Sequence, residues 1–311
     1  MSPDEGAAVM EARVTGTTTG ASAAREAHAR EVEAGERFEF GKNWSAFLEH
    51  LDDARIAEAE RSLRGMLGVD DLRGRTMLDI GSGSGLFSLA ARRLGARVRS
   101  FDYDPASVAC TAELRRRYFP DDEAWHVEQG SVLDADYLRS LGTFDVVYSW
   151  GVLHHTGDMW RAIGNAIEAV APDGLLFIAI YNDQGSWSNR WRAIKRLYCS
   201  GRLGRGLVLG TAIPFFVARG LAADLVWMRN PFRRYAEYSR SRGMSVVHDW
   251  IDWLGGYPFE VAKPEVIFDA VRSRGFRLER LATCGGSVGC NEFVFRRVAD
   301  ARAGNDPLPS R

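Results

Sequence analysis

The stretch Thr76-Met-Leu-Asp-Ile-Gly-Ser-Gly-Ser-Gly-Leu-Phe-Ser88 decides the fold of this chain. Its first five residues are typical of a short apolar strand that carries one acid, Asp79, and the pattern over 86–94 predicts a helix. Three alternating glycines form the turn between strand and helix: Gly81, Gly83 and Gly85. Such glycines let the backbone approach a bound molecule, and the helix N-terminus offers unpaired N–H donors that suit a carboxylate or a phosphate. The turn therefore predicts a ligand site without naming the ligand.

An acid after the next strand narrows the choice of ligand. The apolar stretch 96–101 predicts a second strand, and Asp102 follows it about 20 residues after the glycine turn, where a carboxylate can accept both hydroxyls of a ribose. The glycine spacing differs from the G-x-G-x-x-G pattern of dinucleotide-binding proteins. Instead, the Asp-x-Gly-x-Gly-x-Gly motif together with Asp102 resembles the S-adenosylmethionine-binding motif of class I methyltransferases.

The resemblance covers about 60–300, apart from an insertion, and it implies where the cofactor S-adenosyl-L-methionine binds. Asp102 is expected to hold the ribose, and Tyr103 to cover the adenine. Relatives often place an acid where this chain has Ser131, so the contact to the adenine amino group stays open. The expected cofactor-binding residues are Asp79, Gly81, Ser82, Gly83, Gly85, Asp102, Tyr103, Ser131, Val132 and Trp150.

Alternating strand and helix patterns predict a doubly wound, Rossmann-like α/β fold. We expect a seven-stranded, mostly parallel sheet that ends in an antiparallel hairpin, as in the class I methyltransferase core. The core and an N-terminal helical cover occupy 36–182, a helical insertion follows strand five over 183–262, and 263–299 completes the core. Residues 1–35 contain almost no large apolar side chains and are predicted to be disordered, and 300–311 to be a frayed tail.

Two histidines follow the predicted fourth strand, 144–150, in the sequence Leu153-His154-His155. Within the family, this motif resembles the ubiquinone, menaquinone and sugar O-methyltransferases. A hydroxyl nucleophile needs a base nearby, and neutral imidazole has a suitable pKa. Either His154 or His155 is therefore a candidate catalytic base. Alternatively, both hold the loop by hydrogen bonds.

The predicted insertion carries more basic than acidic residues. Its apolar run, 206–218, is interrupted by Pro214 and is expected to be too short to span a membrane. The insertion is either a packed helical cap or a lid that meets an anionic substrate or a lipid surface in peripheral contact. Asn182, just before it, is expected to face the reaction centre. A polar cluster could fold over the acceptor: His248, Asp249, Trp250, Asp252 and Glu260. Alternatively, it is an ordinary helix with solvated acids, or His248, Asp249 and Glu260 bind a metal.

The cover and the overall composition add further expectations. Lys42 is a candidate contact for the cofactor carboxylate, with Trp44 as a wall. The formal net charge of −1 implies no general affinity for nucleic acid. No apolar leader is visible, and the four cysteines suggest reduced thiols in a cytoplasmic protein. Cys284 and Cys290 lack a second Cys/His pair, so we expect no zinc site there.

The sequence thus predicts a methyltransferase that acts on a hydroxyl of a small molecule, such as a quinone-like phenol, a sugar or a specialised metabolite. Neither an Asn/Asp-Pro-Pro-Tyr/Phe motif nor a Pro-Cys pair follows strand four, which argues against two classes of nucleic-acid methyltransferase. An RNA-modifying enzyme that uses the basic insertion, and a non-catalytic cofactor-binding protein, are the alternatives. The acceptor, the attacked atom and the oligomeric state stay open.

Overall fold

The computed structural model describes residues 24–41, 44, 47–48, 51–228, 246–286 and 289–298. For residues 246–249 and 252 it describes the backbone alone. The expected role of Lys42 and those of the His248, Asp249 and Asp252 side chains therefore lie outside the described residues. The same holds for the predicted tail, 300–311.

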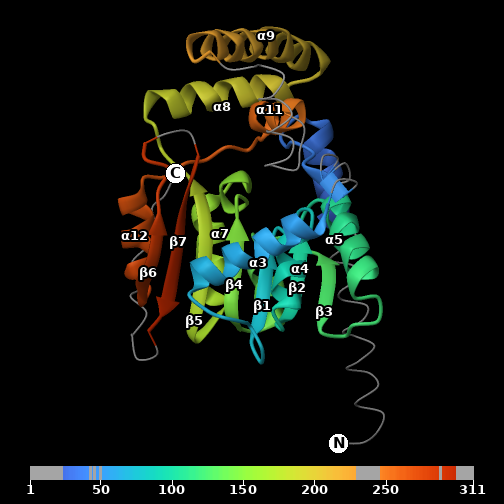
Figure 1. Cartoon of the computed structure of the whole chain (residues 1–311), viewed down its shortest axis with the longest axis vertical. Coiled ribbons are helices and arrows are strands. Elements are labelled where there is room, and N and C mark those ends of the chain that lie inside the picture. The colour runs from blue at the N-terminus through green and yellow to red at the C-terminus, as the bar shows by residue number, and fades with distance from the viewer. Residues whose placement is uncertain are drawn as a thin grey trace, which may run out of the picture.

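Seven strands form one sheet in the order β3-β2-β1-β4-β5-β7-β6 (Figure 1). The strands β1 to β5 pair in parallel, whereas β7 runs antiparallel to both β5 and β6. The predicted doubly wound sheet with its antiparallel C-terminal hairpin is confirmed. The strand bounds are β1 Thr76–Ile80, β2 Arg97–Asp102, β3 Trp125–Gln129, β4 Phe144–Trp150, β5 Val170–Tyr181, β6 Phe276–Ala282 and β7 Cys290–Arg297.

Helices cover both faces of the sheet, which explains why its central strands are apolar on both sides. One face packs against α3 (Asp53–Leu67), α4 (Leu86–Arg93) and α5 (Pro105–Tyr118). The other packs against α6 (Ala135–Leu141), α7 (Met159–Glu168) and α12 (Pro264–Arg272). The strand order reverses between β1 and β4, so the carboxyl ends of the parallel strands open a crevice there.

The insertion is helical in its described residues. It consists of α8 (Ser186–Cys199), α9 (Arg202–Val226) and α11 (Val246–Gly255). Figure 1 shows these helices beyond the carboxyl ends of the parallel strands, with α9 outermost. A small apolar cluster joins them to the N-terminal segment through Phe38, Tyr198, Val208 and Leu254. The insertion therefore sits directly over the crevice.

The expected interruption at Pro214 is wrong, because α9 is one helix of 25 residues with Pro214 in its interior. Pro214 and Gly210, the residue one turn before it, are both exposed, so water can replace the hydrogen bond that proline cannot donate. The expectation that the segment is too short to cross a membrane is wrong for the same reason. By length and composition alone, α9 is one helix that could do so among the described residues.

The predicted disorder of residues 1–35 is wrong for 24–35, since 24–33 form a helix. Polar and aromatic contacts take the place of an apolar core there. His28 is buried, its ring contacts the Tyr103 ring edge-on, and its Nε2 lies 3.9 Å from a carboxylate oxygen of Asp104. The Arg37 guanidinium pairs with Glu31 from this helix. Residues 1–23 lie outside the description.

Candidate active site

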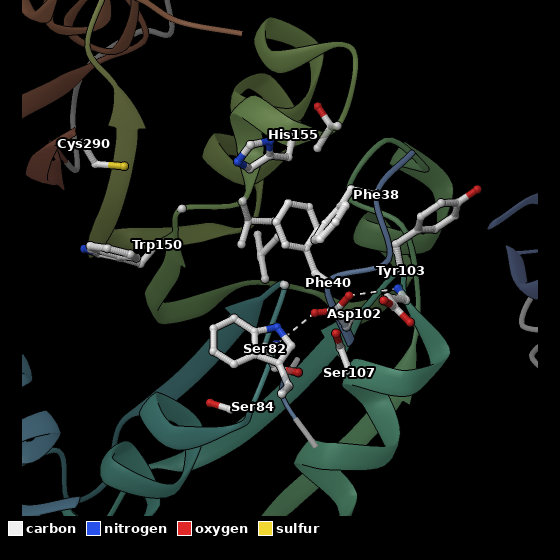
Figure 2. Close-up of a pocket in the computed structure, with 18 of the residues that line it drawn as sticks. Phe38, Phe40, Ser82, Ser84, Asp102, Tyr103, Ser107, Trp150, His155 and Cys290 are labelled. Atoms are coloured by element: carbon white, nitrogen blue, oxygen red, sulfur yellow. Dashed lines mark hydrogen bonds between the residues drawn. The ribbon is translucent and has the colours of Figure 1, made fainter. Parts of the chain in front are cut away.

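A cavity of about 1180 Å³ lies in the crevice between the sheet, the N-terminal segment and the insertion. Sites for a single small molecule are typically about 300–1,000 Å³, so this one has room for two molecules side by side. Figure 2 shows Asp102 and Tyr103 at one end and Trp150 and Cys290 at the other. Asp102 ends β2 and Trp150 ends β4, the two strands that flank β1, whereas Cys290 is the first residue of β7.

The carboxylate of Asp102 is fixed by the backbone at the end of β2. Its Oδ2 accepts a hydrogen bond of 2.9 Å from the Gly83 amide, and its Oδ1 accepts one of 2.9 Å from the Asp104 amide. Each oxygen keeps a further lone pair, which is what the two hydroxyls of a ribose require. Burial raises the pKa of Asp102 to about 6, so the carboxylate is charged at neutral pH. These donor and acceptor positions fit the expected cofactor.

Glycine is required at two positions of the turn that faces Asp102. Gly81 has a φ of +77°, and a Cβ there would lie 2.4 Å from the side chain of Val152. Gly83 has a φ of +54°, and its Cβ would lie 3.2 Å from the Trp44 indole. A side chain at either position would strain the backbone and would also crowd Val152 or Trp44. Trp44 itself lines the cavity, as expected of a wall residue.

Nine of the ten expected cofactor-binding residues line the cavity. The exception is Gly85, with a φ of +81°, where a Cβ would lie 2.9 Å from the Cα of Thr111 on α5. Gly85 therefore lets α4 and α5 approach each other and is absent from the cavity wall. The nine are Asp79, Gly81, Ser82, Gly83, Asp102, Tyr103, Ser131, Val132 and Trp150.

Asp79 is almost completely buried beneath the turn, where the Ser88 hydroxyl donates to it. Burial raises its pKa to about 7, and the nearby Asp102 carboxylate acts in the same direction. Asp79 is consequently close to half-protonated at neutral pH. It can therefore meet the Ser88 hydroxyl either as an acceptor or as a donor.

The N-terminal segment closes the end of the cavity at Asp102 and Tyr103. Sequence reasoning missed Glu31 because it predicted disorder over 1–35, and nothing in the pattern singled out Arg37. The Tyr103 hydroxyl donates to Glu31 at 3.0 Å, and the Arg37 guanidinium lies 4.8 Å from the Tyr103 ring centroid. Arg37 also donates to the backbone oxygens of His155 at 3.0 Å and Thr156 at 3.3 Å. Arg37 thus ties the segment to the loop that follows β4.

The structure separates the two candidate bases. His155 lines the cavity, whereas His154 does not and is fully buried, packed against the rings of His155 and Tyr181. The Nδ1 of His155 lies 2.6 Å from the carbonyl oxygen of Pro258. Since a carbonyl only accepts, Nδ1 carries the proton and Nε2 keeps its lone pair. Burial lowers the pKa of His155 to about 3, so its imidazole is neutral at physiological pH.

The insertion supplies the wall opposite the glycine turn. Phe216 and Arg219 of α9 and Trp250 and Trp253 of α11 line the cavity. The sequence signal for Trp250 was its place in the predicted polar cluster, whereas nothing in the pattern singled out Phe216. The aromatic wall continues onto the core through Tyr181.

Two expected acceptor residues have structural partners instead. The Glu260 carboxylate accepts from the Met159 amide at 3.0 Å, and the Glu260 amide donates to the His154 carbonyl at 2.9 Å, so this residue braces the loop after β4. The Asn182 side chain accepts from Asn291 at 3.1 Å and does not line the main cavity. Within the residues described, no three potential metal-ligating side chains cluster.

The glycine turn, the acid after β2 and the strand order together define a class I methyltransferase fold and site. Residues 47–225 match a family model described as "Methyltransferase domain". This match covers more than half of the chain, and the chain belongs to that family. The predicted class of enzyme, a class I S-adenosylmethionine-dependent methyltransferase, and its predicted cofactor are confirmed.

Individual relatives are similar to part of the chain. A ubiquinone biosynthesis O-methyltransferase of Methylobacterium sp. (strain 4-46) is 33% identical over 129 residues, which are 41% of this chain and 49% of that protein. A tRNA U34 carboxymethyltransferase of Klebsiella pneumoniae is 32% identical over 111 residues, 35% of this chain and 32% of the relative. The chain spans about half the length of the curated relatives it matches first.

Among solved structures, magnesium protoporphyrin IX methyltransferase from Synechocystis PCC 6803 with bound SAH is 13% identical. The match covers 78% of this chain and 83% of that one, with a TM-score of 0.47.

Proposed function

We propose that this protein transfers the methyl group of S-adenosylmethionine to a hydroxyl of a small aromatic molecule. One observation carries the proposal. A single cavity runs from Asp102 and the glycine turn to an aromatic wall on the insertion, with His155 on its lining. Donor and acceptor can therefore lie next to each other, which methyl transfer requires more than any covalent help from the protein.

The chain's own residues then have three tasks. The cofactor, when bound, supplies a methyl group already activated on a sulfonium. Asp102 binds the ribose, and the backbone N–H groups of the turn and of the start of α4 orient the methionine carboxylate. The N-terminal segment, tied down by Arg37, and the insertion exclude water.

His155 is the residue that meets the acceptor hydroxyl in this proposal. Its Nε2 is free to accept a hydrogen bond because Nδ1 donates to Pro258. Its pKa of about 3 makes it a weak base, so it suits an acidic hydroxyl. A phenol, with a pKa of about 10 in tyrosine, loses its proton far more readily than a sugar hydroxyl does. We therefore favour a phenol over a sugar as the acceptor.

The opposite wall supports an aromatic acceptor as well. Tyr181, Phe216, Trp250 and Trp253 offer flat apolar surfaces on which a ring can stack. Arg219 places a cation on the same wall, where an anionic substituent of the acceptor would be favourable. The relatives named as ubiquinone biosynthesis O-methyltransferases are consistent with a phenolic acceptor.

An RNA acceptor is the second candidate, since other relatives are named tRNA U34 carboxymethyltransferase and the insertion is basic. Incubation with methyl-deuterated S-adenosylmethionine, a quinol and phenol panel, and bulk tRNA separates the candidates by mass spectrometry. We expect label in a phenol. Label in tRNA would assign the RNA reaction, and binding of the cofactor without any label would favour a non-catalytic protein.

A further inference from the structure

The outer surface of α9 exposes far more apolar side chain than a water-soluble helix usually does. Only 11% of its most apolar 18-residue window is buried within the described structure. Leu203 is 92% exposed and Leu225 is 79% exposed, and Trp227 and Met228 directly after the helix are 70% and 92% exposed. Apolar patches of this kind mark an interaction surface. Leu207, Phe215, Leu221 and Val226 extend it along the helix.

The inner side of α9 is fixed to the protein. Residues separated by multiples of four pack inward, among them Gly204, Val208 and Gly220. A Cβ at Gly204 would lie 2.1 Å from the Leu197 carbonyl oxygen of α8. Phe216 contacts the rings of Trp250 and Trp253 on α11. The helix is therefore held flat across α8 and α11, which argues for contact with an apolar phase along its outer side and against a crossing.

The charges around the patch have one sign. The described residues 186–228 contain seven basic residues and one acid, Asp224. Both Asp224 and one of the cations, Lys195, are buried, so every exposed charge in this segment is an arginine. The sequence that follows, 229–245, adds five arginines and one glutamate. The exposed arginines are Arg190, Arg192, Arg196, Arg202, Arg205 and Arg219.

We propose that the surface formed by α8 and α9, here called the α8–α9 surface, docks onto an anionic lipid bilayer. The helix α9 then lies in the interface with its exposed apolar residues among the acyl chains. The exposed arginines other than Arg219, which lines the cavity, lie among the headgroups. A second copy of the chain is a poorer occupant, because a symmetric contact would bring the same arginines face to face. Apolar side chains alone would fit either partner, and the uniform positive charge selects the lipid.

This docking gives the proposed function a route for its acceptor, and to that extent it rests on the proposed function. Phe216, Arg219, Gly220 and Ala223 of α9 line the active-site cavity, while the exposed leucines lie on the same helix. One helix thus separates the bilayer from the acceptor end of the cavity. An apolar phenol dissolved in the membrane would enter next to α9 without crossing water.

Flotation of the full chain with lipid vesicles tests the docking directly. We compare phosphatidylcholine vesicles with vesicles containing one part phosphatidylglycerol to two parts phosphatidylcholine. The protein should float with the anionic vesicles, and high salt should reduce the floating fraction several-fold. A Leu207→Glu/Leu225→Glu variant should lose at least ten-fold in vesicle affinity. The matched Leu281→Glu/Val298→Glu variant changes two exposed apolar residues outside the insertion and should float like the wild type.

Three results would overturn the proposal. They are failure of the wild type to float with anionic vesicles, equal flotation of the α9 variant, and a dimer in light scattering that the α9 variant abolishes. Titration with S-adenosylhomocysteine shows that each variant is folded and keeps its cofactor site. Wild-type protein that floats but methylates no phenol would support the docking and refute the proposed function. Wild-type protein that methylates a phenol but does not float would support the proposed function and refute the docking.

Discussion

Two carboxyls, a buried one at Asp79 and a half-buried one at Asp102, lie near the ends of neighbouring strands and have different environments. Asp102 accepts two backbone N–H groups and faces the cavity, whereas Asp79 has a serine hydroxyl as donor beneath the turn. The motif predicted both positions, because acids at strand ends next to glycines are visible in the sequence. It could not predict that Asp79 would be the harder of the two to ionise, since that follows from burial.

The stability of the protein should fall as pH rises because of Asp79. Its pKa is about 7 in the folded chain against an ordinary value of 3.8. Between these values the native state holds a proton that the unfolded state has released, so the free energy of unfolding decreases with increasing pH. An Asp79→Asn variant lacks this penalty. Its melting temperature relative to the wild type should rise from about pH 4 to about pH 7 and then level off.

The exposed Asp121→Asn substitution serves as the control for that series, and its melting temperature should track the wild type at every pH. A gap between Asp79→Asn and wild type that stays constant with pH would show that Asp79 titrates normally in the fold.

His155 should matter for turnover and not for cofactor binding. A His155→Asn variant can still donate to Pro258 but lacks Nε2, so the acceptor hydroxyl loses its partner. We expect kcat to fall about 100-fold with unchanged S-adenosylhomocysteine affinity. The exposed His126→Asn substitution is the control. Normal turnover of His155→Asn would show that His155 is not the base for the acceptor hydroxyl.

At the scale of elements, strand positions were readable because apolar runs and turn residues repeat along the core. The structure confirms β1 and β4 with the expected bounds and moves the strand predicted over 96–101 by one residue, to Arg97–Asp102. The helix over 24–33 could not be predicted, because its contacts are with Tyr103 and Asp104, far away in the sequence. Pro214 misled the prediction of α9, because a proline predicts a break, and the exposure of Pro214 and of Gly210 to water is known only from the structure.

The glycine turn should tolerate no side chain at Gly81. The left-handed φ and the 2.4 Å approach of a Cβ to Val152 would displace either the turn or the loop after β4. A Gly81→Val variant should keep a folded circular dichroism spectrum and lose at least ten-fold in S-adenosylhomocysteine affinity. Gly65→Ala in α3 is the matched control, because no atom lies within 4 Å of a Cβ there. It should bind normally and be about 0.5–1 kcal/mol more stable. Unchanged affinity in Gly81→Val would mean that the turn does not contact the cofactor.

The insertion should determine acceptor binding. Phe216→Ala removes a ring that lines the cavity and contacts Trp250 and Trp253. We expect KM for the acceptor to rise about ten-fold, by the loss of roughly 1–2 kcal/mol of stacking, with cofactor affinity unchanged. The exposed Phe215→Ala substitution next to it is the control for acceptor binding. Equal effects of the two substitutions would place acceptor recognition elsewhere.

At the scale of the whole molecule, three separate parts of the chain enclose one cavity. The sheet provides Asp102 and the glycine turn, the N-terminal segment provides Arg37, and the insertion provides Phe216 and its aromatic neighbours. The sequence predicted the first part, because its motif is contiguous. For the other two parts the sequence predicted a cover with Trp44 and a possible lid. Which of their further residues reach the cavity depends on contacts between distant segments, which no local pattern contains. The same arrangement places the α8–α9 surface directly outside the acceptor end.

Calorimetric titration with S-adenosylhomocysteine tests the central claim most directly. Wild-type protein should bind one molecule per chain. Asp102→Asn should weaken the affinity more than ten-fold, because hydrogen bonds to a charged acceptor contribute about 1.5–3 kcal/mol each. Asp121→Asn should bind like the wild type. Wild-type protein that fails to bind, or Asp102→Asn that binds equally well, would contradict the assignment of the cavity to S-adenosylmethionine.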